Sequence, residues 1–247
     1  MSFATLLRQA SQQLLDLVFP PRCVVCQRTG TWLCSTCLAR LPRLPIQVCV
    51  RCGKPEASGL CASCRQAPLA IDGIRSVLRF EDSARHTIHC FKYANRPVLA
   101  TPLAGLMAEY WREQPLPADV IVPVPLHVAR QRERGYNQAD LLARALGHSI
   151  NLPVSGNALR RVRPTPAQVG LNMAERRANV CGAFASPGIS YAQGSSVTWG
   201  NPDVPVYGQR VLVVDDVCTT GATLEACSLA LRAAGAVSVW GFTLARA

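Results

Sequence analysis

Eight cysteines in four C-x-x-C pairs dominate the first third of this chain and limit what that part can fold into. The pairs fall within 42 residues, as Cys23/Cys26, Cys34/Cys37, Cys49/Cys52 and Cys61/Cys64. One C-x-x-C turn places two thiolates along one edge of a zinc tetrahedron, and a second turn completes a four-sulfur site. Residues 22–66 show no convincing helix or strand pattern, so we expect metal binding and folding to be coupled there.

The spacing of the four pairs favours two successive zinc sites. Gaps of seven, eleven and eight residues separate the pairs, and the two short gaps group the first pair with the second and the third with the fourth. An interleaved arrangement stays open, because spacing alone does not fix connectivity. Disulfides are the alternative to zinc, but the N-terminus lacks the apolar core of an export signal, and a reducing compartment favours metal ligands. Both Zn²⁺ sites would be structural, since protein sulfurs fill all four positions.

The composition indicates a globular, cytoplasmic protein without a membrane span. Hydrophobic residues make up 49% of the 247 residues and charged residues 17%, and no 18-residue apolar run occurs. The formal charge is +11, mostly from arginine; each zinc ion with four thiolates would carry −2, which lowers the total to +7. Because the guanidinium fork binds phosphate well, this excess favours a polyanionic partner.

The pattern along the chain divides it into three parts. We expect an amphipathic helix at residues 1–19, a double zinc ribbon at 20–67 and an α/β domain at 68–247, with a Ser-, Gly- and Pro-rich loop insertion at 186–208. Alternating apolar runs and helical patterns in the third part predict βαβ units and a mostly parallel sheet. The expected strands are Ile74–Phe80, Val120–Val124, Val211–Asp215 and Val237–Leu244, and the expected helices are Ala84–Tyr93, Val98–Arg112, Gln138–His148 and Ala222–Ala234.

The sharpest local motif lies at residues 211–223. An apolar strand runs into two adjacent carboxylates, Asp215 and Asp216, and then into a hydroxyl- and glycine-containing turn that precedes a helix. Free N–H groups at a helix N-terminus suit a phosphate monoester, and two carboxylates can accept hydrogen bonds from a vicinal diol. Together these groups describe a ribose 5-phosphate site, whereas ordinary Asp and Thr helix caps are the simpler alternative. The turn comprises Thr219, Thr220, Gly221, Ala222 and Thr223.

This motif resembles the phosphoribosyl pyrophosphate (PRPP) motif of type I phosphoribosyltransferases. From residue 20 onward, apart from residues 186–208, the chain resembles the ComF/GntX family of competence and DNA-utilisation proteins. Further segments that carry the resemblance are Phe91–Arg96, Val122–Leu126, Arg134–Gln138, Thr165–Gln168 and Arg176–Asn179.

The resemblance implies a double zinc ribbon joined to a type I phosphoribosyltransferase-like α/β domain, a parallel sheet flanked by helices. It also implies that Asp215 and Asp216 hold the ribose hydroxyls of PRPP, that residues 219–223 hold its 5-phosphate, and that Mg²⁺ accompanies PRPP. No residue is assigned as a general acid or base. The candidates for the pyrophosphate loop and the mobile hood over it are Lys92, Pro125, Leu126, His127 and Arg134.

Arginines are concentrated between residues 126 and 180, where the net charge is +6. Arg130, Arg132 and Arg134 alternate, so on an extended loop they would share one side. Such a surface could follow a single-stranded DNA backbone, or its arginines could meet the pyrophosphate of PRPP, or they could simply be solvated. The candidates for nucleic-acid contact are Arg130, Arg132, Arg134, Arg160, Arg161 and Arg176.

Two functional hypotheses follow from the resemblance. The first is a PRPP-binding protein that acts in DNA uptake and natural transformation or in the use of external DNA, with single-stranded DNA and the uptake or helicase machinery as partners. The second is an active phosphoribosyltransferase in nucleobase salvage. The chain ends three residues after Leu244, and no base-recognition segment is evident there. Whether transfer occurs, and to which acceptor, stays open at this stage.

Overall fold

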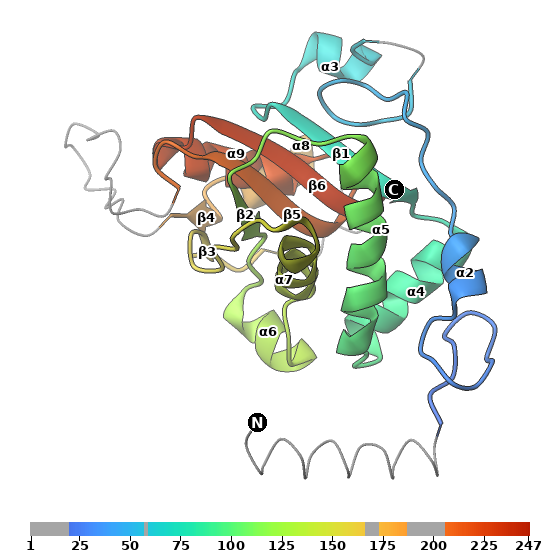
Figure 1. Ribbon diagram of the computed structural model, residues 1–247. Helices are drawn as coiled ribbons and strands as arrows, with labels where there is room; N and C mark the ends of the chain where they lie inside the picture. The colour runs from blue at the N-terminus through green and yellow to red at the C-terminus, as the bar shows by residue number, and fades with distance from the viewer. Residues whose placement is uncertain (1–19, 57–58, 166–172, 187–205) are drawn as a thin grey trace.

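The computed structural model describes residues 20–56, 59–165, 173–186 and 206–247 (Figure 1). The helix expected at residues 1–19 and nearly all of the expected insertion lie outside these ranges.

Four parallel strands form the central sheet. They are β1 (Gly73–Arg79), β2 (Val120–Pro123), β5 (Arg210–Cys218) and β6 (Ser238–Arg246), in the order β1-β6-β5-β2. Val214 of β5 lies opposite Pro123 of β2 and Phe242 of β6. A sheet covered on both faces needs apolar residues on both sides of its strands, which explains the unbroken run Val211–Val214. The parallel α/β fold is thereby confirmed.

Helices cover both faces of this sheet (Figure 1). Helices α5 (Ala100–Glu113) and α7 (Gln138–Ile150) pack together on one face, next to α4 (Asp82–Tyr93). Helices α9 (Ala222–Ala233) and α8 (Met173–Val180) pack together on the other face. The short 3₁₀ turn Pro97–Leu99 leads into α5. Within the described ranges, no helix is both long and apolar enough to cross a bilayer, and the longest, α5, has 14 residues.

The segment expected to be an extended loop is instead a helix, α6 (Val128–Arg134). His127 caps its start by accepting a hydrogen bond from the Ala129 amide at 3.3 Å, and Gly135 ends it with φ +78°. The extended-loop prediction was wrong because this segment is polar at nearly every position. It therefore lacks the apolar periodicity by which a helix is recognised in a sequence. On a helix, residues two apart point to nearly opposite sides, so Arg132 does not share a side with its two neighbours in the pattern.

Two residue pairs form a small antiparallel ribbon beside α9. Strand β3 (Arg160–Arg161) pairs with β4 (Phe184–Ala185), with Arg161 opposite Phe184.

Each zinc-ribbon segment contains a one-turn helix that the sequence pattern did not predict. Helix α2 (Ser35–Ala39) starts directly after Cys34, and α3 (Ala62–Gln66) starts directly after Cys61. Five residues are too few to show a helical period, which explains the omission.

The two ribbons pack into different cores. Cys23, Leu33 and Cys34 of the first ribbon belong to the core that contains α4, α5 and α7. The four cysteines of the second ribbon belong to the core under α9, together with Leu69 and Ile74. Figure 1 shows α2 beside α4 and α3 at the opposite end of β1. The ribbons therefore contact the two faces of one sheet.

The chain between the ribbons covers the outer edge of β1. Leu44 N donates to Val77 O, and Arg79 N donates to Pro42 O, both at 2.9 Å. The opposite edge of the sheet is covered by the stretch after α7, since Ile121 N donates to Pro153 O at 2.9 Å. Both edge strands thus have backbone partners, as open sheets require to avoid pairing with other chains.

Candidate ligand site and zinc centres

The eight ribbon cysteines form two four-sulfur clusters, and each cluster unites successive pairs. Within each cluster, all sulfur atoms lie within 4.8 Å of one another. The Sγ atoms of Cys26 and Cys34 are 3.7 Å apart, and so are those of Cys52 and Cys61. Two sulfurs bound to one tetrahedral zinc at about 2.3 Å would lie ~3.8 Å apart. The geometry therefore fits zinc and confirms successive rather than interleaved pairing.

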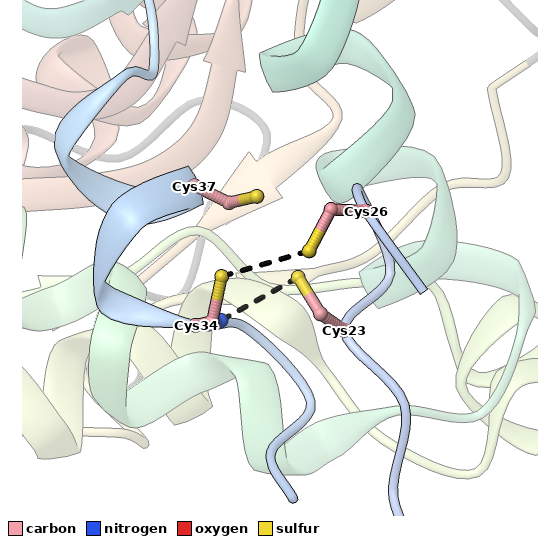
Figure 2. Close-up of side chains that lie close together, drawn as sticks. All are labelled: Cys23, Cys26, Cys34 and Cys37. Carbon is pink, nitrogen blue, oxygen red and sulfur yellow. Dashed lines mark hydrogen bonds between the residues drawn. The ribbon is translucent and has the colours of Figure 1, made fainter. Parts of the chain in front are cut away.

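The first cluster has its sulfurs directed at one another (Figure 2). The amide of Cys34 donates to Cys23 Sγ at 3.5 Å, and Cys61 N donates to Cys49 Sγ at 3.3 Å in the second cluster. Although burial raises the pKa of Cys23 and Cys49, backbone amide hydrogen bonds lower the pKa of each thiol to about 6. Such amides stabilise the thiolate form that zinc requires.

The candidate ribose-phosphate site lies where β5 ends and the turn before α9 begins. A cavity of about 240 Å³ opens there, lined by Asp215, by residues 217–219 and 221–224, and by Phe80 and Lys92. The carboxyl ends of parallel strands and the N-terminus of α9 meet at this point, which is where open α/β sheets bind ligands. Apolar β5 residues thus position two acids at a ligand-sized opening.

The two acidic side chains leave the strand toward different neighbours. Asp216 is buried, and its Oδ1 lies 2.6 Å from Nζ of Lys92 on α4. Asp215 stays partly accessible, and its Oδ1 accepts the Asp216 amide at 2.9 Å. Desolvation of its carboxyl group at the strand end and the adjacent Asp216 carboxylate raise the pKa of Asp215 to about 7, against the opposing effects of Lys92 and Arg161. Near neutral pH, a bound diol or cation can therefore change its protonation.

Gly221 gives the turn before α9 its shape and its contact with the second ribbon's core. Its φ is +88°, in the left-handed region, and a Cβ there would lie 2.8 Å from Leu69 Cδ1 and 2.9 Å from Ile74 Cδ1. Only glycine allows both the conformation and this approach. The turn that carries Thr219 and Thr220 consequently rests on residues that follow the second zinc ribbon.

A larger cavity of about 590 Å³ lies beside the end of β2, next to the candidate pyrophosphate turn. Pro125, Leu126, Arg160 and Arg161 line it. Arg134 is directed elsewhere: its guanidinium donates to Tyr93 Oη and Gln138 Oε1 at 3.1 Å each and stacks on the Tyr93 ring.

The other candidate arginines do not form one continuous face. Arg130 donates to Thr165 O at 3.1 Å, and Arg161 donates to the hydroxyl of the same threonine. Burial and the nearby Arg130 lower the pKa of the half-buried Arg161. Arg132 on α6 and Arg160 on β3 are exposed, and Arg176 lies on α8. The structure thus joins Arg130 to Arg161 through Thr165, whereas Arg132 is exposed to solvent.

Two arginines make contacts that the sequence did not predict. Arg177 forms a 2.9 Å ion pair with Glu225 of α9. Arg246, on β6, donates to Cys52 O at 2.7 Å and lies 3.3 Å from Cys218 Sγ. These contacts join positions 28 to 194 residues apart, so no local pattern could have shown them.

Comparison with known proteins follows the same division of the chain. Residues 14–67 match the family model described as double zinc ribbon domain. DNA utilization protein YhgH of Salmonella typhi is 33% identical over 238 residues, covering 91% of this chain and 97% of that protein. The chain belongs to the ComF/GntX family. Competence protein F of Haemophilus influenzae is 32% identical over 240 residues (92% and 97%), and competence protein ComFC of Bacillus subtilis is 27% identical over 223 residues (87% and 84%).

Solved structures similar to this ComF/GntX chain include two enzymes whose names refer to phosphoribosyl compounds. Glutamine PRPP amidotransferase from B. subtilis matches 61% of this chain and 26% of its own, with 22% identity and a TM-score of 0.35. Purine phosphoribosyltransferase from Pyrococcus horikoshii matches 60% and 83%, with 18% identity and a TM-score of 0.33.

Proposed function

We propose that this protein binds PRPP and serves the uptake or use of external DNA in the cytoplasm. The observation that carries the proposal is the constellation at the end of β5: a cavity of about 240 Å³ bordered by Asp215, the Thr219–Thr223 turn and Lys92. The carboxylates suit the ribose diol, and the amides and hydroxyls of the turn suit the 5-phosphate. Mg²⁺ would accompany the diphosphate of PRPP, as it does for polyphosphates generally.

Lys92 has a definite part in this proposal. Its ammonium group lies 2.6 Å from the Asp216 carboxylate and its side chain lines the cavity, so it offsets one of two adjacent negative charges where a polyanion must bind. Without that cation, the two acids would repel the phosphates of the ligand. Arg160 and Arg161 at the neighbouring larger cavity offer positive charge on the pyrophosphate side.

The biological part of the proposal comes from the relatives. The family members bear the names DNA utilization protein and competence protein, which fit a role with incoming DNA and not nucleobase salvage. The formal charge of +11, or +7 with both zinc sites filled, suits contact with single-stranded DNA. We include the DNA-uptake or helicase machinery as a partner, and no transfer reaction to a free base.

Calorimetric titration with PRPP and Mg²⁺ tests the ligand. The double substitution Asp215→Asn and Asp216→Asn should weaken binding at least about 30-fold, since charge-assisted bonds to the diol are lost. Asp119→Asn is the matched control. Asp119, just before β2, pairs with Arg210 at the start of β5, far from the end that carries Asp215. This substitution should leave the affinity for PRPP within about twofold of the wild type. Equal affinity of the double variant and the wild type would refute the ribose assignment.

Fluorescence anisotropy with a labelled oligonucleotide tests DNA contact. The logarithm of affinity should fall linearly with the logarithm of salt concentration. Substituting the exposed Arg132 and Arg160 by Gln should flatten that slope by up to about two. A slope near zero in the wild type would remove single-stranded DNA from the proposal.

A further inference from the structure

A second cavity lies between the Thr219–Thr220 turn and the second zinc ribbon, and residues of both line it. Its volume is about 250 Å³, and Thr219 borders both this cavity and the one at Asp215. The ribbon contributes Lys54 and Ser63 to its wall, and the turn contributes Thr219 and Thr220. The two cavities thus adjoin at Thr219, in the turn to which the proposed function assigns a phosphate.

Basic and hydroxyl groups dominate the polar wall of this cavity. Lys54, Arg177 and Arg246 supply three cations, and Ser63, Thr219 and Thr220 supply three hydroxyls. Three cysteines of the second cluster and Ala247 also line the cavity, and no Asp or Glu side chain of the described residues does. Two of the cations have other partners. Arg177 is paired with Glu225, and Arg246 bonds to Cys52 O beside the cluster, where it can offset the charge of the zinc-bound thiolates.

Lys54 is different. Within the part of the chain that the structure describes, no ion pair or hydrogen bond of its ammonium group is found. The backbone under it is nevertheless fixed, because Cys49 N donates to Lys54 O at 2.7 Å. The preceding Gly53 has φ +73° and lies so close to Ile74 O that a Cβ would be 2.3 Å from it. A rigid knuckle therefore presents an unpaired cation at the phosphate turn.

We propose that the second zinc ribbon is part of the phosphate site and that Lys54 contacts the 5-phosphate group held by the Thr219–Thr220 turn. This inference rests on the proposed function and adds a binding residue from a different segment of the chain. Leu69 and Ile74, which follow the ribbon, support the turn, and the ribbon itself then supplies positive charge to a phosphate monoester. A charge-assisted hydrogen bond of this kind contributes more to affinity than a neutral one.

The first ribbon provides a matched control. Arg28 occupies the position in the first ribbon that Lys54 occupies in the second, two residues after the second cysteine of a C-x-x-C pair. The backbone contact is the same, since Cys23 N donates to Arg28 O at 2.8 Å. Both side chains are exposed, yet only Lys54 lines a cavity at the turn. Arg28→Met therefore repeats the loss of a knuckle cation away from the site.

The experiment measures binding of three probes to the full chain by calorimetry: PRPP, ribose 5-phosphate and inorganic pyrophosphate. Lys54→Met and Lys54→Gln should weaken PRPP and ribose 5-phosphate at least about tenfold and leave pyrophosphate within about twofold. Lys54→Arg should stay within about threefold of the wild type for all three probes. Arg28→Met should match the wild type throughout, and every variant should retain two zinc ions by mass spectrometry.

The outcomes separate the two proposals. If the wild type binds neither PRPP nor ribose 5-phosphate, the proposed function fails, and this inference fails with it. If the wild type binds both and Lys54→Met binds them equally well, only the role of Lys54 is refuted. A loss of affinity that follows zinc content rather than the charge at position 54 would also refute the role of Lys54. An equal loss of affinity for pyrophosphate would refute it too, because Lys54 would then act through folding alone.

Discussion

Replacing Asp215 by Asn should stabilise the protein, and the gain should grow with pH. The folded state holds the pKa of Asp215 at about 7, above the ordinary aspartate value of about 3.9. A carboxyl whose pKa is raised on folding binds its proton more tightly in the folded state than in the unfolded state. Stability is therefore greatest at low pH and is lost as pH rises between about 4 and 7. Asn resembles the protonated acid and can still accept the Asp216 amide at Oδ1.

The size of the effect follows from the same shift. At about 1.4 kcal/mol per pKa unit, three units set an upper limit of about 4 kcal/mol above pH 7. Because Asp215 keeps part of its surface in water and Lys92 lies nearby, we expect about 1–2 kcal/mol at pH 8. At pH 5.5 the gain should be roughly half of that value.

Urea unfolding between pH 5.5 and 8.5, with zinc present throughout, measures this difference. Asp119→Asn is a control of opposite sign: hydrogen bonds from Arg210 hold the pKa of Asp119 at about 2. Both its folded and unfolded pKa values lie below the pH window, so its loss should destabilise by an amount that does not change with pH. If Asp215→Asn is less stable than the wild type at pH 8, or its margin does not grow with pH, the assignment of a raised pKa is wrong.

Three further perturbations test other parts of the structure. Protein purified without added metal should contain about two zinc ions per chain by mass spectrometry, and Cys23→Ser or Cys61→Ser should each reduce this to about one; one ion in the wild type would contradict the two clusters. Lys92→Met leaves the buried Asp216 without its cation and should cost about 2–4 kcal/mol in urea unfolding, and no loss would show that the pair is not formed. Gly221→Ala should cost about 1–3 kcal/mol, more than Gly182→Ala, which has a similar φ of +63° but open space around it; equal costs would mean that Leu69 and Ile74 do not limit the turn.

The sequence was most informative where function depends on consecutive residues. The apolar run that ends in two acids identified β5 and its turn, because a strand buried on both faces has a distinctive composition. The cysteine spacing identified both ribbons for a similar reason. Helix α6 was missed because its polar residues hide the period, and its stability comes from the His127 cap and the Gly135 end.

Contacts between distant segments could not be predicted. The placement of the second ribbon next to the Thr219–Thr220 turn depends on pairs such as Ala70 N with Glu225 Oε1, at 2.9 Å, which join residues 155 positions apart. The partner of Lys92 was equally hidden, since the resemblance offered a pyrophosphate role and the structure pairs it with Asp216. A single sequence does not indicate which helix lies next to the end of which strand, as α4 lies next to the end of β5 here.

Residues 42–44 lie along the outer edge of β1. Because of this position, we expect loss of zinc to promote self-association of the protein. These residues run between the two zinc clusters, so both ions anchor the segment that keeps the outer strand from pairing elsewhere. A truncation that begins at residue 68, or a cell starved of zinc, would leave a row of free amides and carbonyls on β1. We therefore expect metal-depleted chains to dimerise or precipitate through that strand rather than to persist as inactive monomers, so that zinc supply limits the amount of protein and not only its activity.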